Sequence, residues 1–133
     1  MATKVVNAGL AIITSRIRGS GTEPIYTGWG TGGGTTAVTD TTLFAEKALD
    51  LSSSSGTRVS GTPTQQTTTV SNDTWMLSAV LTATGSGTVT NGGCFDNATI
   101  GSGNCYVKGD FTGIPIVAAD SINFIIKTAF VSG

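Results

Sequence analysis

Histidine is absent from this chain of 133 residues, and charged residues make up only 11% of it. Without histidine, the commonest general base and the commonest metal ligand are both missing, and no Ser-His-Asp or Cys-His arrangement can form. Seven Lys and Arg residues against eight Asp and Glu residues give a net charge of −1 at pH 7. Nucleic-acid binding needs clustered Lys and Arg, and here the basic residues are scattered. We therefore expect no nucleic-acid partner and no histidine-dependent enzyme.

Long apolar runs, a secretory signal and a metal-binding cluster are also missing. No segment approaches ~18 consecutive apolar residues, the length that suggests a membrane-spanning helix. The first residues, Met-Ala-Thr-Lys, are followed by neither the apolar core nor the cleavage site of a signal peptide. Two cysteines without histidine are too few for a zinc site. We expect no membrane contact, no metal, no cofactor, and synthesis in a bacterial cytoplasm.

Acidic residues remain the one route to catalysis, because a pair of carboxylates can act as general acid and base. Nearly all of them lie beside Thr, Ser, Asn or Gly, in turn positions where aspartate binds the backbone. The glycine run Gly28–Gly33 fits the dinucleotide pattern G-x-G-x-x-G, but no helix follows its third glycine directly. We therefore expect a turn there, and no enzyme. The acidic residues considered are Asp40, Glu46, Asp50, Asp73, Asp96, Asp110 and Asp120.

Threonine, serine and glycine fill the sequence instead, with 19 glycines among them. Threonine is β-branched and suits a pleated strand, while glycine permits tight turns. The pattern predicts a single, mainly β domain over residues 1–133, an antiparallel, jelly-roll-like β-sandwich. The clearest predicted strands are residues 25–29, 75–82, 88–95, 105–111 and 122–130.

Two helices are predicted beside the strands. Residues 4–18 have apolar side chains at helical spacing, and Thr39-Asp40-Thr41 offers N-caps to a short helix through Leu43–Glu46. The first helix, within residues 1–19, either closes one end of the sandwich or contacts a neighbouring subunit. The face that would make the inter-subunit contact consists of Val6, Leu10, Ile13 and Ile17.

The two cysteines, Cys94 and Cys105, lie on either side of the loop 96–104. If the flanking strands form a hairpin centred near Thr99 and Ile100, the thiols face each other at a distance that a disulfide can span. Such a bridge would contribute on the order of 3 kcal/mol. The alternative is that both are small buried apolar residues, as unbridged cysteines often are in proteins made inside cells. Both alternatives stay open.

Short motifs rich in Gly, Asp and Thr follow one another along most of the chain. They are Asn7-Ala8-Gly9-Leu10, Gly21-Thr22-Glu23-Pro24, Trp29-Gly30-Thr31-Gly32, Thr39-Asp40-Thr41-Thr42-Leu43, Asn72-Asp73-Thr74-Trp75, Gly93-Cys94-Phe95-Asp96, Lys108-Gly109-Asp110-Phe111 and Asp120-Ser121-Ile122. Their order resembles a family of small virion proteins of tailed bacteriophages, described as tail-fibre-like. The Gly93–Asp96 motif also resembles a turn in the adaptor domains of phage tail fibres, where an aliphatic residue replaces Cys94. The resemblance implies a structural role in a virus particle.

Three functional hypotheses follow. The first is a capsid decoration or cement protein that stabilises the head lattice by binding the major capsid protein and copies of itself, with a trimer as one arrangement. The second is a tail adaptor or fibre-anchor protein that binds tail proteins. Both place the protein in the virion. The third is a carbohydrate-binding module on a particle surface, which an exposed Trp29 or Trp75 in a groove would favour.

Overall fold

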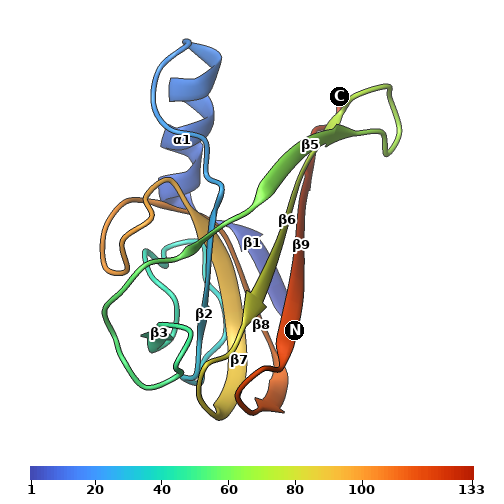
Figure 1. The fold of residues 1–133 in the computed structure, drawn as a ribbon. Helices are drawn as coiled ribbons and strands as arrows, with labels where there is room; N and C mark the ends of the chain where they lie inside the picture. The colour runs from blue at the N-terminus through green and yellow to red at the C-terminus, as the bar shows by residue number, and fades with distance from the viewer.

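A computed structural model describes all 133 residues as two antiparallel sheets with one helix (Figure 1). The larger sheet has the strand order β1-β8-β7-β2-β3, with β4 also paired to β2, and the smaller sheet has the order β5-β6-β9. The antiparallel sandwich with an N-terminal helix is thus confirmed. The elements are β1 (Ala2–Val5), α1 (Asn7–Ile17), β2 (Tyr26–Gly30), β3 (Glu46–Lys47), β4 (Val59–Ser60), β5 (Thr62–Gln66), β6 (Thr74–Thr82), β7 (Gly87–Phe95), β8 (Cys105–Ile116) and β9 (Ser121–Ala129).

The core between the two sheets follows from the period-two alternation of β6. Leu77, Ala79 and Leu81 are buried on one face of β6, while Val80 and Thr82 on the other face are exposed. Across the gap, Trp29 of β2 and Val89 of β7 are fully buried against this face. The predicted strand over residues 75–82 is therefore confirmed, and so is its apolar face.

The N-terminal segment differs from the helix predicted over residues 4–18. Residues Ala2–Val5 form β1, which pairs with β8 from Ala2↔Asp110 to Val5↔Val107, and α1 begins only at Asn7. The β-branched Val5 and Val6 favour the extended backbone, and the Val6 N–H donates to the Tyr106 carbonyl at 3.0 Å. Residues 1–19 are therefore partly built into the larger sheet.

The short helix predicted through Leu43–Glu46 is also absent. Its residues belong to an irregular layer, residues 31–58, that covers the outer face of the larger sheet. Bare backbone on that face lets the layer approach closely. A Cβ at Gly28 would lie 2.6 Å from Glu46 Oε1, and one at Gly93 would lie 3.1 Å from the Leu43 side chain. The glycine run predicted as a turn therefore begins as strand β2.

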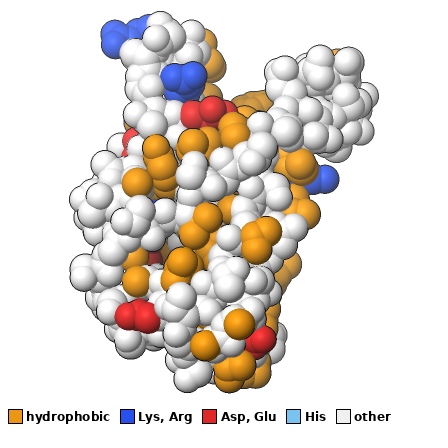
Figure 2. Space-filling model, in the orientation of Figure 1, with side chains coloured by type: hydrophobic (Ala, Val, Ile, Leu, Met, Phe, Trp, Pro, Cys, Tyr) orange, Lys and Arg blue, Asp and Glu red, His pale blue; other side chains and the backbone are white.

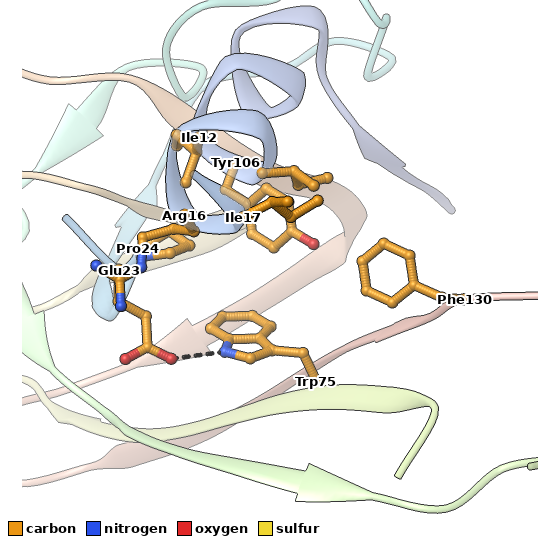
Figure 3. Close-up of a pocket in the computed structure, with 9 residues that line it drawn as sticks. Ile12, Arg16, Ile17, Glu23, Pro24, Trp75, Tyr106 and Phe130 are labelled. Atoms are coloured by element: carbon orange, nitrogen blue, oxygen red, sulfur yellow. Dashed lines mark hydrogen bonds between the residues drawn. The ribbon is translucent and has the colours of Figure 1, made fainter. Parts of the chain in front are cut away.

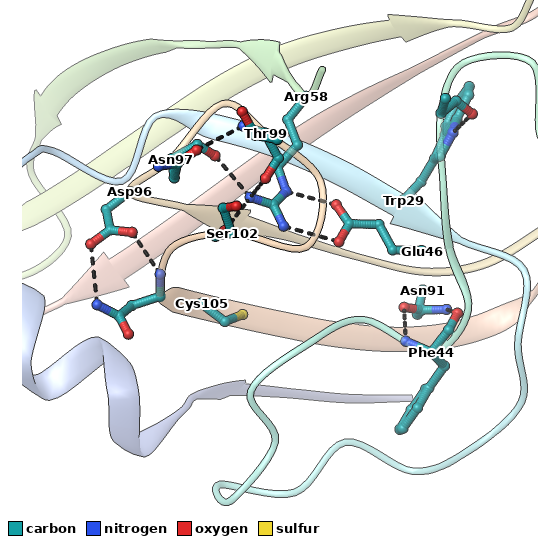
Figure 4. Close-up of polar contacts among 12 residues, drawn as sticks. Trp29, Phe44, Glu46, Arg58, Asn91, Asp96, Asn97, Thr99, Ser102 and Cys105 are labelled. Atoms are coloured by element: carbon teal, nitrogen blue, oxygen red, sulfur yellow. Dashed lines mark hydrogen bonds and ion pairs between the residues drawn. The ribbon is translucent and has the colours of Figure 1, made fainter. Parts of the chain in front are cut away.

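Two buried cations hold this outer layer in place. Arg58, with a side chain only 1% exposed, pairs with Glu46 at 2.7 Å (Figure 4). Its guanidinium lies 3.5 Å from the centroid of the Phe95 ring. Lys108, equally buried, pairs with Asp40 at 2.8 Å. Its Nζ lies 3.2 Å from the centroid of the Phe44 ring. Each charge thus has a carboxylate and an aromatic face, as burial of a charge requires.

The sandwich is not closed along β9, the outer strand of the smaller sheet. Its inward-facing residues Ile122, Phe124 and Ile126 are only half buried, whereas Leu77 and Leu81 of the neighbouring strand are at most 1% exposed. The smaller sheet ends at β9, which has no strand on its other side. No helix of the structure has the length and apolar character needed to cross a membrane.

The close approach at Gly93 gives a first testable prediction. In a Gly93→Ala variant the new methyl group meets the Val107 carbonyl and lies 3.1 Å from Leu43, so the outer layer must shift. We expect a loss of about 1–3 kcal/mol in the free energy of unfolding, measured by urea titration. Gly33→Ala is the matched control, because nothing lies within 4 Å of a Cβ there. Equal stability of the two variants would contradict this packing.

Carboxylates that fix loops give a second prediction, for pH. Backbone N–H groups of Val70, Thr68 and Thr69 hold the pKa of Asp73 below its usual value of 3.8, and a hydrogen bond from Lys108 lowers the pKa of Asp40. A pKa that is lower in the folded state means that the ionised form stabilises the fold. This contribution is present above about pH 4 and is lost as the pH falls below it. We expect the thermal midpoint to fall in that acidic range, and to fall less steeply for Asp73→Asn; an unchanged slope in the variant would refute the assignment.

Candidate functional site

Helix α1 projects away from the sandwich and touches it mainly through its first half (Figure 1). Gly9 rests directly on β8, because a Cβ there would lie 2.7 Å from the Tyr106 carbonyl. Ile12 is buried beside Leu77 and Tyr106. Further along, Ile17 is 83% exposed. The second half of the helix is therefore surrounded largely by solvent, although an isolated helix of 11 residues is marginal in water.

An apolar groove of about 350 Å³ lies between α1 and the ends of β6 and β9 (Figure 3). One wall comes from the helix, and the other comes from Trp75 and Phe130, with Tyr106 of β8 between them. In the space-filling view, hydrophobic side chains gather where the helix and the tip of the smaller sheet diverge (Figure 2). The lining residues are Ile12, Ile13, Arg16, Ile17, Glu23, Pro24, Trp75, Tyr106 and Phe130.

Two polar side chains at the groove bind to other parts of the chain. The Trp75 indole N–H donates to Glu23 Oε1 at 2.9 Å, and the Arg16 guanidinium donates to the Gly21 carbonyl at 3.0 Å. Trp75 and Tyr106 pack edge to face with ring centroids 5.3 Å apart. These contacts hold the aromatic walls in place and leave an apolar surface facing the groove, so the site is suited to apolar side chains.

Only three of the four residues predicted for an inter-subunit contact lie together on the helix. Leu10 is 55% exposed, Ile17 is more exposed still, and Ile13 is half buried at the groove. These three residues form a stripe that we call the α1 stripe. Val6 does not belong to it, because it precedes the helix and is fully buried beside Leu43. The expectation that Val6 contacts a neighbour is therefore wrong, and the role of the other three stays a prediction.

The groove itself was not foreseen from the sequence. Trp75 and Phe130 continue the period-two apolar patterns of their predicted strands, with Leu77 and with Phe124. The pattern does not indicate that these ends of β6 and β9 extend beyond the larger sheet and face α1 (Figure 1). Trp29, the other tryptophan considered for sugar binding, is fully buried, with its indole N–H bonded to the Ala48 carbonyl at 3.1 Å. It cannot serve as a binding platform.

The two cysteines lie on opposite faces of the larger sheet. Cys94 pairs with Val107, and Cys105 pairs with Phe95 after a bulge, so the two thiols do not face each other as the simple hairpin predicts. Cys94 packs between the sheets beside Leu77, whereas Cys105 packs beneath the irregular layer, and both are unbridged. The structure therefore favours the alternative of two small buried residues.

The acidic side chains have structural roles. Asp50 accepts hydrogen bonds from the Ser52 and Ser53 N–H groups, Asp96 from that of Asn104, and Asp120 from that of Val117. Their predicted role in turns is confirmed. Glu46 and Asp40 instead pair with the buried cations described above. No group of three or more His, Cys, Asp or Glu side chains lies together in a way that could hold a metal ion.

No family model matches the chain, and no similar protein was found among curated proteins or solved structures. Hypotheses about function therefore depend on the chain's own residues.

The thiols provide a third prediction. Burial raises the pKa of Cys94 well above its usual value and raises that of Cys105 to about 12, so both stay protonated and unreactive at pH 8. We expect almost no alkylation of the native protein by iodoacetamide at that pH, and two alkylated thiols after unfolding without a reductant. A mass that shows no alkylation after unfolding would reveal a bridge and overturn the assignment.

Proposed function

We propose that this protein is a non-catalytic structural component of a phage particle, and that it binds a neighbouring particle protein with the groove and the α1 stripe. The observation that carries the proposal is the projecting apolar surface. Leu10 and Ile17 extend from the sandwich into solvent beside a groove lined mainly by apolar side chains. Exposed apolar patches of this kind commonly mark protein–protein contacts.

The chemistry of the groove favours a protein segment as its occupant. A sugar would need several free hydrogen-bond donors and acceptors along the site, whereas the Trp75 indole and the Arg16 guanidinium are engaged with the chain itself. An apolar segment of a neighbour, by contrast, gains from displacing water at Ile13, Trp75 and Phe130. The carbohydrate hypothesis retains only Trp75, because Trp29 is buried.

Within the particle, we propose the capsid decoration role, with the major capsid protein as the partner. Support comes from the low charge of the chain and from its many hydroxyl-bearing surface residues, which allow dense packing against neighbours without strong charge repulsion. The tail adaptor role is the alternative. Quantitative mass spectrometry of purified particles distinguishes them, because a lattice protein is present on the order of hundreds of copies and a symmetric tail ring in about a dozen or fewer.

The fourth prediction tests the α1 stripe. We expect the double variant Leu10→Ser/Ile17→Ser to keep its unfolding midpoint, because both side chains are already largely exposed. Its binding to phage heads that lack the native protein should weaken about tenfold or more, since docking buries these side chains. Co-sedimentation with separately purified heads and tails measures this effect.

Val117→Ser is the matched control, because Val117 is similarly exposed at 59% but lies in the turn between β8 and β9. The control should bind heads like the unmodified protein. Unchanged head binding by the double variant would refute the docking role of the α1 stripe. Glycan binding lost on Trp75→Ala, with no binding to heads or tails, would refute the proposal in favour of the carbohydrate hypothesis.

A further inference from the structure

Strand β9 leaves one side of its backbone unpaired. It pairs with β6 along all nine residues, and no strand lies on its other side. At its two ends, the Phe130 N–H donates to the Asp73 carbonyl and the Asp120 carbonyl accepts from Ala83. Even-numbered residues therefore bond to β6, and odd-numbered residues point their N–H and C=O groups outward. These unpaired groups form a row from Ser121 to Ala129.

This edge lacks the features by which proteins usually block edge strands. Natural edges are short, or contain proline, bulges or several charges. The opposite edge of the same sheet, β5, has five residues and includes Pro63, and the larger sheet ends in the four-residue β1. By contrast, β9 is nine residues long, pairs without a bulge, and has Lys127 as its only charge. It is thus the long, regular and open edge of the molecule.

Apolar side chains are also incompletely buried along the same edge. Ile122, Phe124 and Ile126 face inward but stay half buried, and the Phe124 ring packs against Phe111 of β8 with centroids 6.3 Å apart. On the other face of β9, Ile125 is 57% exposed. A further strand beside β9 would therefore satisfy the backbone and also cover apolar side chains on both faces of the sheet.

We propose that β9 pairs antiparallel with β9 of a second copy, about a two-fold axis at Ile125, to form one continuous sheet across the dimer. In this register Ser121 lies opposite Ala129 of the second copy, Asn123 opposite Lys127, and Ile125 opposite Ile125. Odd-numbered residues are the bonded ones, so each such pair exchanges two backbone hydrogen bonds. On the inner face, Phe124 meets Ile126 of the second copy.

Charge and side-chain type explain why the occupant is a second copy. With the strands fully overlapped, the only charge, Lys127, faces the neutral Asn123, so no like charges oppose each other. A shift that brought Lys127 against its own equivalent would shorten the overlap and add repulsion. The interface is isologous, as two-fold dimers require. The inference does not depend on the α1 stripe, which lies on the helix, and the groove borders β9 only at Phe130, just after the strand ends.

Sedimentation equilibrium and native mass spectrometry of the full chain test the dimer. We expect a monomer–dimer equilibrium in the micromolar range, weakened at least tenfold by Ile125→Pro. The N–H of Ile125 points outward, so this proline removes no bond to β6 and suits an edge strand. The control is Val80→Thr, an exposed valine in the central strand β6, which should leave the dimer intact. Thermal unfolding verifies that each variant folds.

A charge exchange tests the register without altering the backbone. Asn123→Lys places lysines opposite each other twice per dimer and should weaken it about 5- to 30-fold. Adding Lys127→Glu to that variant creates two opposite-charge pairs and should restore or tighten the dimer. The intrachain neighbours of these positions, Val80 and Met76, are uncharged, so pairing with β6 is little affected.

Several results would overturn the proposal. A protein that stays monomeric at every concentration would refute it, and so would a dimer that Ile125→Pro does not weaken. If Ile125→Pro abolishes the dimer but Asn123→Lys and Lys127→Glu leave its affinity unchanged, the proposed register is refuted. A monomeric chain whose β9 instead binds a strand of a capsid or tail protein would refute the second copy as occupant. Leu10→Ser/Ile17→Ser should leave the dimer unchanged, so failure of head docking and failure of this proposal are distinguishable.

Discussion

The buried guanidinium of Arg58 is the contact on which the irregular outer layer depends. It joins Glu46, in the middle of that layer, to the carbonyls of Asn97, Thr99 and Ser102 in the β7–β8 loop (Figure 4). The Phe95 ring covers the face of the guanidinium. Loss of one partner from such a buried pair typically costs about 3–5 kcal/mol, because the remaining charge has no water to replace it. A layer with almost no regular secondary structure is thereby fixed in one arrangement. Lys108 acts in the same way on the neighbouring part of the layer through Asp40 and Phe44.

The contrast between the two faces of the larger sheet explains which parts of the fold could be predicted. The inner face packs on the apolar face of the smaller sheet, whose strands β6 and β9 follow from their period-two alternation in the sequence. The outer face is lined by glycines and covered by charged and aromatic residues, and no periodicity predicts that arrangement. The prediction of a helix through Leu43–Glu46 was wrong because tertiary contacts fix the conformation of those residues. Asn91, for example, bonds both the N–H and the C=O of Phe44 as a neighbouring strand would.

The candidate site was predicted only in part, for a geometric reason. Helical spacing identified Leu10, Ile13 and Ile17 as one face, and the structure leaves Leu10 and Ile17 of that face exposed while Ile13 is half buried beside the core. The same spacing wrongly included Val6, because a β-branched pair begins the chain as a strand before the helix starts. Trp75, Tyr106 and Phe130 come from three separate strands or strand ends, and only the three-dimensional arrangement brings them beside α1. The cysteines show a related limit, since the observed register pairs Cys94 with Val107 and Cys105 with Phe95, whereas a hairpin centred near Thr99 and Ile100 would place the two thiols opposite each other.

The distribution of unsatisfied groups is what most favours assembly. On the outer side of the larger sheet, the buried charges of Arg58 and Lys108 are each paired with a carboxylate. On the side of β9 and α1, backbone groups, half-buried core residues and exposed isoleucines remain in contact with water. One proline or a few charged residues in β9 would be enough to block pairing at this edge. The sequence from Ser121 to Ala129 instead keeps the edge regular and almost uncharged. This asymmetry is expected of a subunit whose core and edge are completed by neighbours.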